Sequence, residues 1–260
     1  MDMVINQLKM ANIPESIKIR MEKVLKSQVK KNLNLQEDYK CSKCRDMTFI
    51  LDGDTATICE CRKLREAERI LEISGISNEF RKKIFDNFDY SVSRDVLNAY
   101  VKAKTYAKDF DYISDSRHNS IVFMGNSGSG KTHLSLAISN YLMNSGVGVL
   151  YMSYRDSIVN IKQSIMDSEN YNRVMSRYKN AKVLLIDDLF KGRITDSDVN
   201  IMFEIINYRY FNNKPMIIST ELSKEKLINI DEAIGSRILE MCRGYSVELC
   251  GRELNYRLNG

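Results

Sequence analysis

Short apolar runs separated by amphipathic segments dominate the chain from residue 95 to residue 219. The apolar runs have the length and content of buried β-strands, and they occupy residues 120–124, 147–152, 183–186 and 215–219. Elsewhere apolar side chains recur at three- and four-residue steps, which predicts helices over residues 95–110, 134–143, about 154–178 and 197–211. Strands that alternate with helices form a parallel sheet covered on both faces, so the pattern predicts an α/β fold.

The first 75 residues have a different pattern. Apolar positions among many lysines predict helices over the first forty residues, either as an amphipathic surface for a partner or as helices packed within the chain. Residues 48–51 and 55–58 predict a hairpin with an Asp-Gly turn, and a charged helix over residues 63–73 follows. Because Gly75 is suited to end that helix, we expect an N-terminal arm over residues 1–75 and a second domain over residues 76–260.

Size and composition are those of an ordinary globular chain. Its 260 residues, of which 43% are hydrophobic, can build one core of domain size and a smaller appendage. No apolar run is long enough to cross a bilayer, and the N-terminus lacks the pattern of a secretory signal, so we expect a cytoplasmic protein without membrane contact. The net charge of +5 permits contact with nucleic acid but does not require it.

The predicted strand over residues 120–124 leads into a glycine-rich loop that opens the next helix. The loop reads Gly125-Asn126-Ser127-Gly128-Ser129-Gly130-Lys131-Thr132. Glycines let successive N–H groups point at a phosphate, Lys131 can reach the terminal phosphates, and the Thr132 hydroxyl can bind Mg²⁺. A chance glycine-rich turn is the alternative, but the strand before the loop and the helix after it favour a cradle for nucleotide phosphates.

Two carboxylates, Asp187 and Asp188, follow the apolar run 183–186. In a P-loop ATPase the first carboxylate holds magnesium and the second orients or activates the attacking water, so we assign Asp187 to the metal and Asp188 to the water. The alternative is an aspartate pair that caps the next helix. Ligands of parallel sheets bind at the carboxyl ends of the strands, and both motifs fall there.

Four of the six cysteines form two close pairs, Cys41 with Cys44 and Cys59 with Cys61. Four thiolates from two short turns suit tetrahedral Zn²⁺, which would stabilise a segment too small to build its own core. The second pair is a C-x-C, tighter than the common C-x-x-C, so a redox pair or unliganded thiols stay open as alternatives. Cys242 and Cys250 have apolar neighbours and are expected as buried free thiols.

With these motifs the chain resembles the bacterial DnaC/DnaI-type helicase loaders, AAA+ ATPases that also include the IstB transposition proteins. The resemblance covers roughly residues 80–257 and rests on Asn87-Phe-Asp-Tyr90, the glycine-rich loop, Ile186-Asp-Asp-Leu189, Ile217-Ile-Ser-Thr220 and Asp231-Glu-Ala-Ile-Gly-Ser-Arg-Ile238. The four-cysteine arm resembles the zinc-bearing N-terminal domain of the DnaI-like branch, including phage-encoded versions. The resemblance implies an AAA+ P-loop ATPase with a small helical and zinc-knuckle arm.

Further site residues follow from the resemblance. Arg237 matches the position from which the family projects an arginine into a neighbouring subunit's ATP, which implies self-association, although the sequence alone would make it a solvated helix arginine. Relatives carry a polar residue just past the fourth strand, and we assign this role to Thr220, because Glu221 would add negative charge beside the phosphates. Arg252 and Arg257 resemble the family's closing segment without a firm role.

Contact with single-stranded DNA is also implied by the resemblance, through the helical stretch after the second strand. Basic and aromatic side chains there suit phosphate contact and base stacking, although the same mixture describes many solvated helices. These side chains are Arg155, Lys162, Arg173, Arg177 and Lys179, with Tyr154, Tyr171 and Tyr178.

The function expected from the resemblance is that of an ATP-dependent helicase loader in a bacterial cell or a phage-infected host. It would hydrolyse ATP with magnesium when assembled, bind a replicative DnaB-type hexameric helicase through the N-terminal arm, and place it on single-stranded DNA. The alternative is an IstB-like transposition ATPase that binds duplex DNA and recruits a transposase, for which a four-cysteine arm is not needed. A small-molecule kinase shares the phosphate loop but explains neither Arg237 nor the cysteines.

Overall fold

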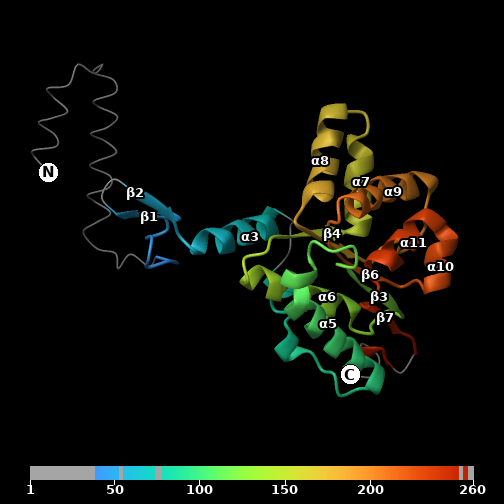
Figure 1. Cartoon of the computed structure of the whole chain (residues 1–260). Coiled ribbons are helices and arrows are strands. Elements are labelled where there is room, and N and C mark those ends of the chain that lie inside the picture. Colours follow the sequence, from blue (N-terminus) through green and yellow to red (C-terminus); the bar gives the residue numbers. More distant parts are fainter. Residues whose placement is uncertain (1–38, 53–54, 74–77, 252–253, 257–260) are drawn as a thin grey trace, which may run out of the picture. The chain divides into compact units, whose positions relative to one another are not determined.

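The computed structural model describes residues 39–52, 55–73, 78–251 and 254–256, and the chain divides into two compact units between Cys59 and Glu60 (Figure 1). The predicted helices before residue 39, the proposed helix end at Gly75, and both Arg252 and Arg257 lie outside the described residues. Within the described part of the chain, no helix combines the length and apolar character needed to span a bilayer.

The first unit contains the predicted hairpin. Strands β1 (Phe49–Asp52) and β2 (Thr55–Ile58) pair antiparallel, with Phe49 opposite Ile58 and Asp52 opposite Thr55. The two strands have the bounds that the sequence predicts within one residue.

The second unit is an α/β domain, as the sequence predicts. Its helices before the first strand are α3 (Cys61–Ile73), α4 (Asn78–Arg81), the 3₁₀ turn η1 (Phe85–Asn87) and α5 (Arg94–Ile113). Strands and helices then alternate as β3 (Ile121–Gly125), α6 (Lys131–Asn144), β4 (Val149–Ser153), α7 (Tyr154–Ser164), α8 (Ser168–Asn180), β5 (Val183–Asp187), α9 (Asp196–Phe211) and β6 (Met216–Thr220). The remaining elements are α10 (Lys224–Ile230), α11 (Glu232–Met241) and β7 (Ser246–Leu249), a strand that the hydrophobic pattern did not predict.

The five strands of this unit form one parallel sheet in the order β4-β5-β6-β3-β7. Strand β6 therefore separates β3, which leads into the glycine-rich loop, from β5, which ends in the aspartate pair. Because all strands run the same way, the loop, the aspartates and the end of β6 meet at one edge of the sheet.

Alternate side chains of each strand enter two separate cores. On β3, Ile121 and Phe123 pack with α5 and α6, while Val122 and Met124 pack with the layer formed by α7 to α11. Figure 1 shows α5 and α6 on one face of the sheet and α7 to α11 on the other. Strands buried on both faces explain why the sequence shows continuous apolar runs rather than alternation.

Helix α3 belongs to the second unit, which therefore begins earlier than the boundary at residue 75 predicts. The reason is packing, because Ala67 of α3 is buried in the first core and Ile70 packs on the turn before β4. A Cβ atom at Gly148 would lie 2.5 Å from the Ile70 side chain, so the glycine leaves room for this contact. A functional arm over residues 1–75 stays a prediction.

Arg209 of α9 is fully buried at the end of the sheet where β5 and β6 begin, opposite the nucleotide loop. Its guanidinium donates hydrogen bonds of 2.6–3.1 Å to the carbonyl oxygens of Tyr178, Lys179, Ala181 and Pro215, which end α8 and precede β5 and β6. Burial lowers the pKa of Arg209 to about 9, which still leaves the group charged at neutral pH. These bonds fix where β5 and β6 begin.

Replacing Arg209 with Met should destabilise the domain by roughly 3 kcal/mol, because four buried carbonyl groups lose their donor. Urea unfolding of the full chain measures this effect. Exposed Arg243, replaced by Met in the same way, should change stability by less than about 0.5 kcal/mol. Equal midpoints for the two variants would contradict the role given to Arg209.

Candidate nucleotide-binding site

The glycine-rich loop between β3 and α6 has a backbone that favours glycine at three points. Gly125, Gly128 and Gly130 have φ angles of 126°, 78° and 87°, in the region that side chains disfavour. A Cβ atom would lie 2.0 Å from the Leu249 carbonyl oxygen at Gly125, and 2.1 Å from Asn255 Oδ1 at Gly128. The loop is therefore packed against the segment that follows β7.

Hydrogen bonds complete this packing. The Asn126 N–H donates to the Leu249 carbonyl oxygen over 3.0 Å, and the Tyr256 N–H donates to the Gly128 carbonyl oxygen over 3.1 Å. Segments far apart in the sequence thus hold the loop from outside.

Lys131 begins α6 with its ammonium group inside the loop. The residue is 4% exposed, and its Nζ donates to the Asn126 carbonyl oxygen over 2.5 Å and to Ser129 Oγ over 3.4 Å. Burial lowers the pKa of Lys131, and nearby carboxylates counteract part of this shift. A buried ammonium with only neutral hydrogen-bond acceptors is well suited to a phosphate, so the loop fits a nucleotide.

Asp187 lies at the end of β5 and accepts hydrogen bonds from three other elements. Thr132 Oγ1 of α6 and Ser219 Oγ of β6 donate to its Oδ1 over 2.9 and 2.5 Å, and the Tyr151 hydroxyl of β4 donates to its Oδ2 over 3.2 Å. Burial raises the pKa of Asp187, and these hydrogen bonds oppose the shift. The structure thus brings together the two residues predicted to hold magnesium, Thr132 and Asp187.

Asp188 follows in a left-handed conformation, with φ of 57°. Its N–H donates to Ser219 Oγ over 2.8 Å, and its Oδ2 is 2.9 Å from Lys191 Nζ. The next helix, α9, is capped by Thr195, so the alternative that the aspartate pair caps this helix is wrong. Both carboxylates instead lie at the phosphate loop.

Thr220 is not placed as predicted. It is fully buried, its hydroxyl donates to the Leu189 carbonyl oxygen over 2.8 Å, and it accepts from the Leu222 N–H over 3.2 Å. Its neighbours on either side carry the polar groups of the site, because Ser219 contacts Asp187 and Glu221 lines the cavity. Side chains alternate along a strand, so a shift of one position moves a residue away from the site.

A cavity of about 510 Å³ extends from the phosphate loop. Part of its lining is charged, with Lys131, Asp188, Lys191 and Glu221. Another part is aromatic and includes Phe88, His133 and Tyr256, with the Phe88 ring 5.1 Å from the His133 ring and 6.2 Å from the Tyr256 ring. Charged and aromatic side chains in one cavity suit a nucleotide with its phosphates and base.

These three aromatic residues were not predicted as site residues. Phe88 belongs to the motif at residues 87–90, which the sequence offered only as a mark of family resemblance. His133 is held by the Ile84 carbonyl oxygen and by Asn87 Oδ1 at 3.1 and 3.0 Å, and burial lowers its pKa, so the ring is neutral at neutral pH. The motif at residues 87–90 was therefore the one available signal for this part of the cavity lining.

Arg237 of α11 does not line this cavity. Its guanidinium donates to the Ala233 carbonyl oxygen over 2.8 Å and lies over the rings of Phe203 and Tyr210, 5.5 and 5.3 Å from their centroids. A role in its own chain's nucleotide site has no support, and the role in a neighbouring subunit stays a prediction.

The basic and aromatic residues predicted to contact DNA all lie on α7 and α8, but they differ in their exposure to solvent. Arg155, Arg173 and Arg177 are exposed. Lys162 and Lys179 form ion pairs of 2.5 Å with Asp198 and Glu204. The three tyrosines turn toward the protein, because Tyr154 is buried, Tyr171 donates to Glu204 and Tyr178 donates to Ser157. The surface thus offers arginines for phosphates, and the base-stacking role predicted for Tyr154 has no support.

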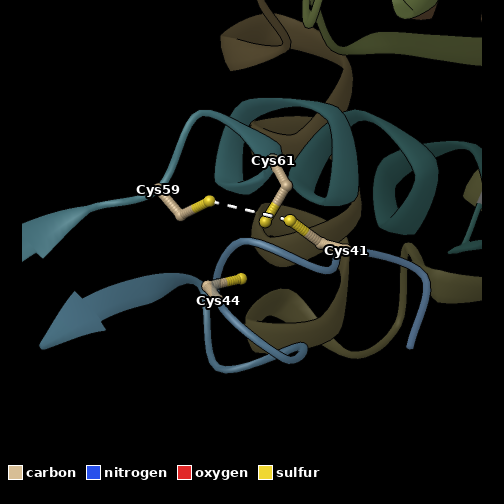
Figure 2. Close-up of side chains that lie close together, drawn as sticks. All are labelled: Cys41, Cys44, Cys59 and Cys61. Atoms are coloured by element: carbon tan, nitrogen blue, oxygen red, sulfur yellow. Dashed lines mark hydrogen bonds between the residues drawn. The ribbon is translucent and has the colours of Figure 1, made fainter. Parts of the chain in front are cut away.

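The four clustered cysteines gather their sulfur atoms at one point, all within 4.8 Å of one another (Figure 2). The Sγ atoms of Cys41 and Cys59 are 3.8 Å apart. Thiolates at about 2.3 Å from a tetrahedral zinc ion are roughly 3.8 Å apart, whereas a disulfide bond is about 2.05 Å long. The donor set and its spacing therefore fit Zn²⁺.

The other two cysteines differ from each other. Cys242 is buried, as predicted, and burial raises the pKa of its thiol. Cys250, which was also expected to be buried, is exposed, because it follows the last residue of β7 at the sheet edge.

A comparison with protein families decides the relationship. The family model described as IstB-like ATP binding protein matches residues 14–244. The chain belongs to the IstB-like family. Membership supports ATP as the nucleotide of the cavity.

Two curated proteins show how far sequence similarity to this chain extends. The phage-like element PBSX protein XkdC of Bacillus subtilis (strain 168) is 38% identical over 235 residues, covering 85% of this chain and 87% of its own length. The replicative helicase loader DnaC of Buchnera aphidicola subsp. Schizaphis graminum is 27% identical, covering 70% of this chain and 71% of its own length.

Solved structures confirm the AAA+ fold of this IstB-like chain. A crystal structure of DnaI superposes with a TM-score of 0.55 at 21% identity, covering 69% of this chain and 94% of that one. AMPPCP-bound DnaA from Aquifex aeolicus superposes with a TM-score of 0.54 at 25% identity, covering 65% of this chain and 50% of that one.

The full chain should bind one zinc ion through the cysteine cluster, as measured by metal analysis after gel filtration. Cys44→Ser should lose the zinc, because a hydroxyl is a poor ligand for this ion. Cys250→Ser removes an exposed thiol outside the cluster and should keep the zinc. A metal-free wild-type chain would contradict the assignment.

Proposed function

We propose that this IstB-like protein is an ATP-dependent loader of a replicative hexameric helicase. The main support for ATP binding is the hydrogen bond of 2.9 Å between Thr132 and Asp187 beside the buried Lys131. This arrangement fits a nucleotide with its magnesium ion. The similarity to a helicase loader DnaC supports the loading role.

Each polar residue of the site has a distinct part in the proposed ATPase. Mg²⁺ would supply positive charge that stabilises the negative charge on the phosphate oxygens. The loop N–H groups and Lys131 would bind phosphate oxygens, and Thr132 and Asp187 would hold the metal. Asp188 would accept a proton from the water as its oxygen bonds to the γ-phosphorus of ATP and ADP leaves. Ser219 keeps the two aspartates in register, since its hydroxyl donates to Asp187 and accepts from the Asp188 N–H.

Self-association completes the site in this proposal. Arg237 is outside the cavity of its own chain and lies over Phe203 and Tyr210, so it would serve the ATP of the neighbouring subunit. ATP binding would then join subunits, and hydrolysis would release them. The exposed arginines of α7 and α8 would contact single-stranded DNA, and the zinc-binding arm over residues 1–75 would bind the helicase.

A transposition ATPase is the second candidate, because the matching family model is named after IstB. Such a protein would bind duplex DNA and recruit a transposase. The cysteine cluster favours the loader, since it offers a compact zinc-stabilised module for a protein partner.

Arg237 can be tested by mixing two inactive variants. Lys131→Ala should lose ATP binding, while Arg237→Ala should bind ATP and lose hydrolysis by on the order of 10³-fold, because an arginine finger contributes at least that much. In a mixture, the Lys131 variant supplies Arg237 to the intact nucleotide site of the other chain, so ATPase activity should return. A mixture as inactive as its components would contradict action between subunits.

The loading role predicts that the full chain, with ATP, co-elutes with a DnaB-type hexamer and binds single-stranded DNA more tightly than duplex. Cys44→Ser should weaken capture of the helicase while ATP binding persists. Binding to both DNA forms over a salt series separates specific from general electrostatic contact. Preference for duplex DNA without helicase capture would favour the transposition ATPase.

A further inference from the structure

Close to Asp187 and Asp188, the site contains a carboxylate to which the proposed ATPase gives no part. This carboxylate is Glu221, just past β6, and it lines the cavity together with Asp188. A third carboxylate would repel the phosphates of a nucleotide, because charges separated by several ångströms in a partly buried site interact appreciably. This repulsion requires compensation.

Lys191 places a positive charge beside Glu221. Its Nζ is 2.9 Å from Asp188 Oδ2 and 2.9 Å from Glu221 Oε1, so one ammonium group bridges the two carboxylates. Lys191, Asp188 and Glu221 are each about one-third exposed and all three line the cavity. Pairs this exposed contribute little to folding stability.

The turn after β5 is built to bring Lys191 back over the carboxylates. The Leu189 N–H donates to the Ser219 carbonyl oxygen over 2.8 Å, and the Lys191 N–H donates to the Asp188 carbonyl oxygen over 3.1 Å. Phe190, with φ of 60°, is buried against the Tyr154 ring at 5.6 Å. The backbone that leads to Lys191 is therefore anchored by contacts with β6 and α7.

We propose that Lys191 is a positioning residue of the ATP site: it neutralises Glu221 and holds Asp188, so that the cavity can accept a triphosphate. This inference rests on the proposed ATPase. The charged side chains named above sum to one negative charge with Lys191 and to two without it, because Lys131 is the other cation and there are three carboxylates. Removing Glu221 should therefore offset the loss of Lys191 in binding. It should not restore the hold on Asp188.

Calorimetry with a non-hydrolysable ATP analogue and magnesium tests the binding part. Lys191→Met should weaken binding roughly tenfold, and the double variant Lys191→Met with Glu221→Gln should regain most of that loss. Lys191→Arg keeps the charge and should bind as wild type. Lys108→Met removes an exposed charge of α5 outside the cavity and should leave affinity unchanged.

Turnover tests the positioning part, because kcat should stay low in both the single and the double Lys191→Met variants. Thermal unfolding without nucleotide checks that every variant is folded. If wild type binds the analogue but Lys191→Met binds equally well, or the double variant binds no better than the single one, the role of Lys191 is overturned and the ATP site stands. If wild type itself binds no analogue, the proposed function fails instead.

Discussion

The carboxylate of Asp187 is the point on which the nucleotide site depends. A carboxylate so deeply buried would be costly without partners, and three hydroxyl groups from α6, β6 and β4 provide them. Since β6 lies between the strands that carry the glycine-rich loop and the aspartates, its Ser219 spans the distance that the sheet order creates. The same hydrogen bonds that oppose the rise in the pKa of Asp187 thus set the spacing between the phosphate loop and the acidic pair.

A site residue could be predicted from the sequence only where it belongs to a recognisable pattern of the chain. The phosphate loop and Asp187 are contiguous with apolar strands, so chain pattern and chemistry agree, and the structure brings Thr132 and Asp187 together. The sequence pointed to Thr220 rather than Ser219, because the hydrophobic pattern identifies a strand but not the face of the sheet to which each side chain points. Strand β7 was missed because its buried residues, Val247 and Leu249, alternate with polar ones and form no apolar run. The aromatic part of the cavity lining combines residues from three distant segments, which periodicity cannot relate.

The cationic side chains discussed above differ in the groups that they contact. Lys131 has neutral acceptors for its ammonium group, whereas Lys191 is bound by two carboxylates. The first cation is thus free to pair with an incoming anion, and the second is already committed to the protein. Arg237 is a third case, since aromatic rings rather than acids hold it. A cation held by ring faces keeps its full charge for a partner, which agrees with a part played between subunits.

The dependence of the glycine-rich loop on the segment after α11 affects how the protein matures. Gly125, Asn126 and Gly128 pack against or bond to Leu249, Asn255 and Tyr256, which are synthesised long after the loop itself. Contacts between such remote parts form late in folding, because a large loop of chain must close first. A nascent chain on the ribosome therefore cannot complete the phosphate loop until residues 249–256 have emerged.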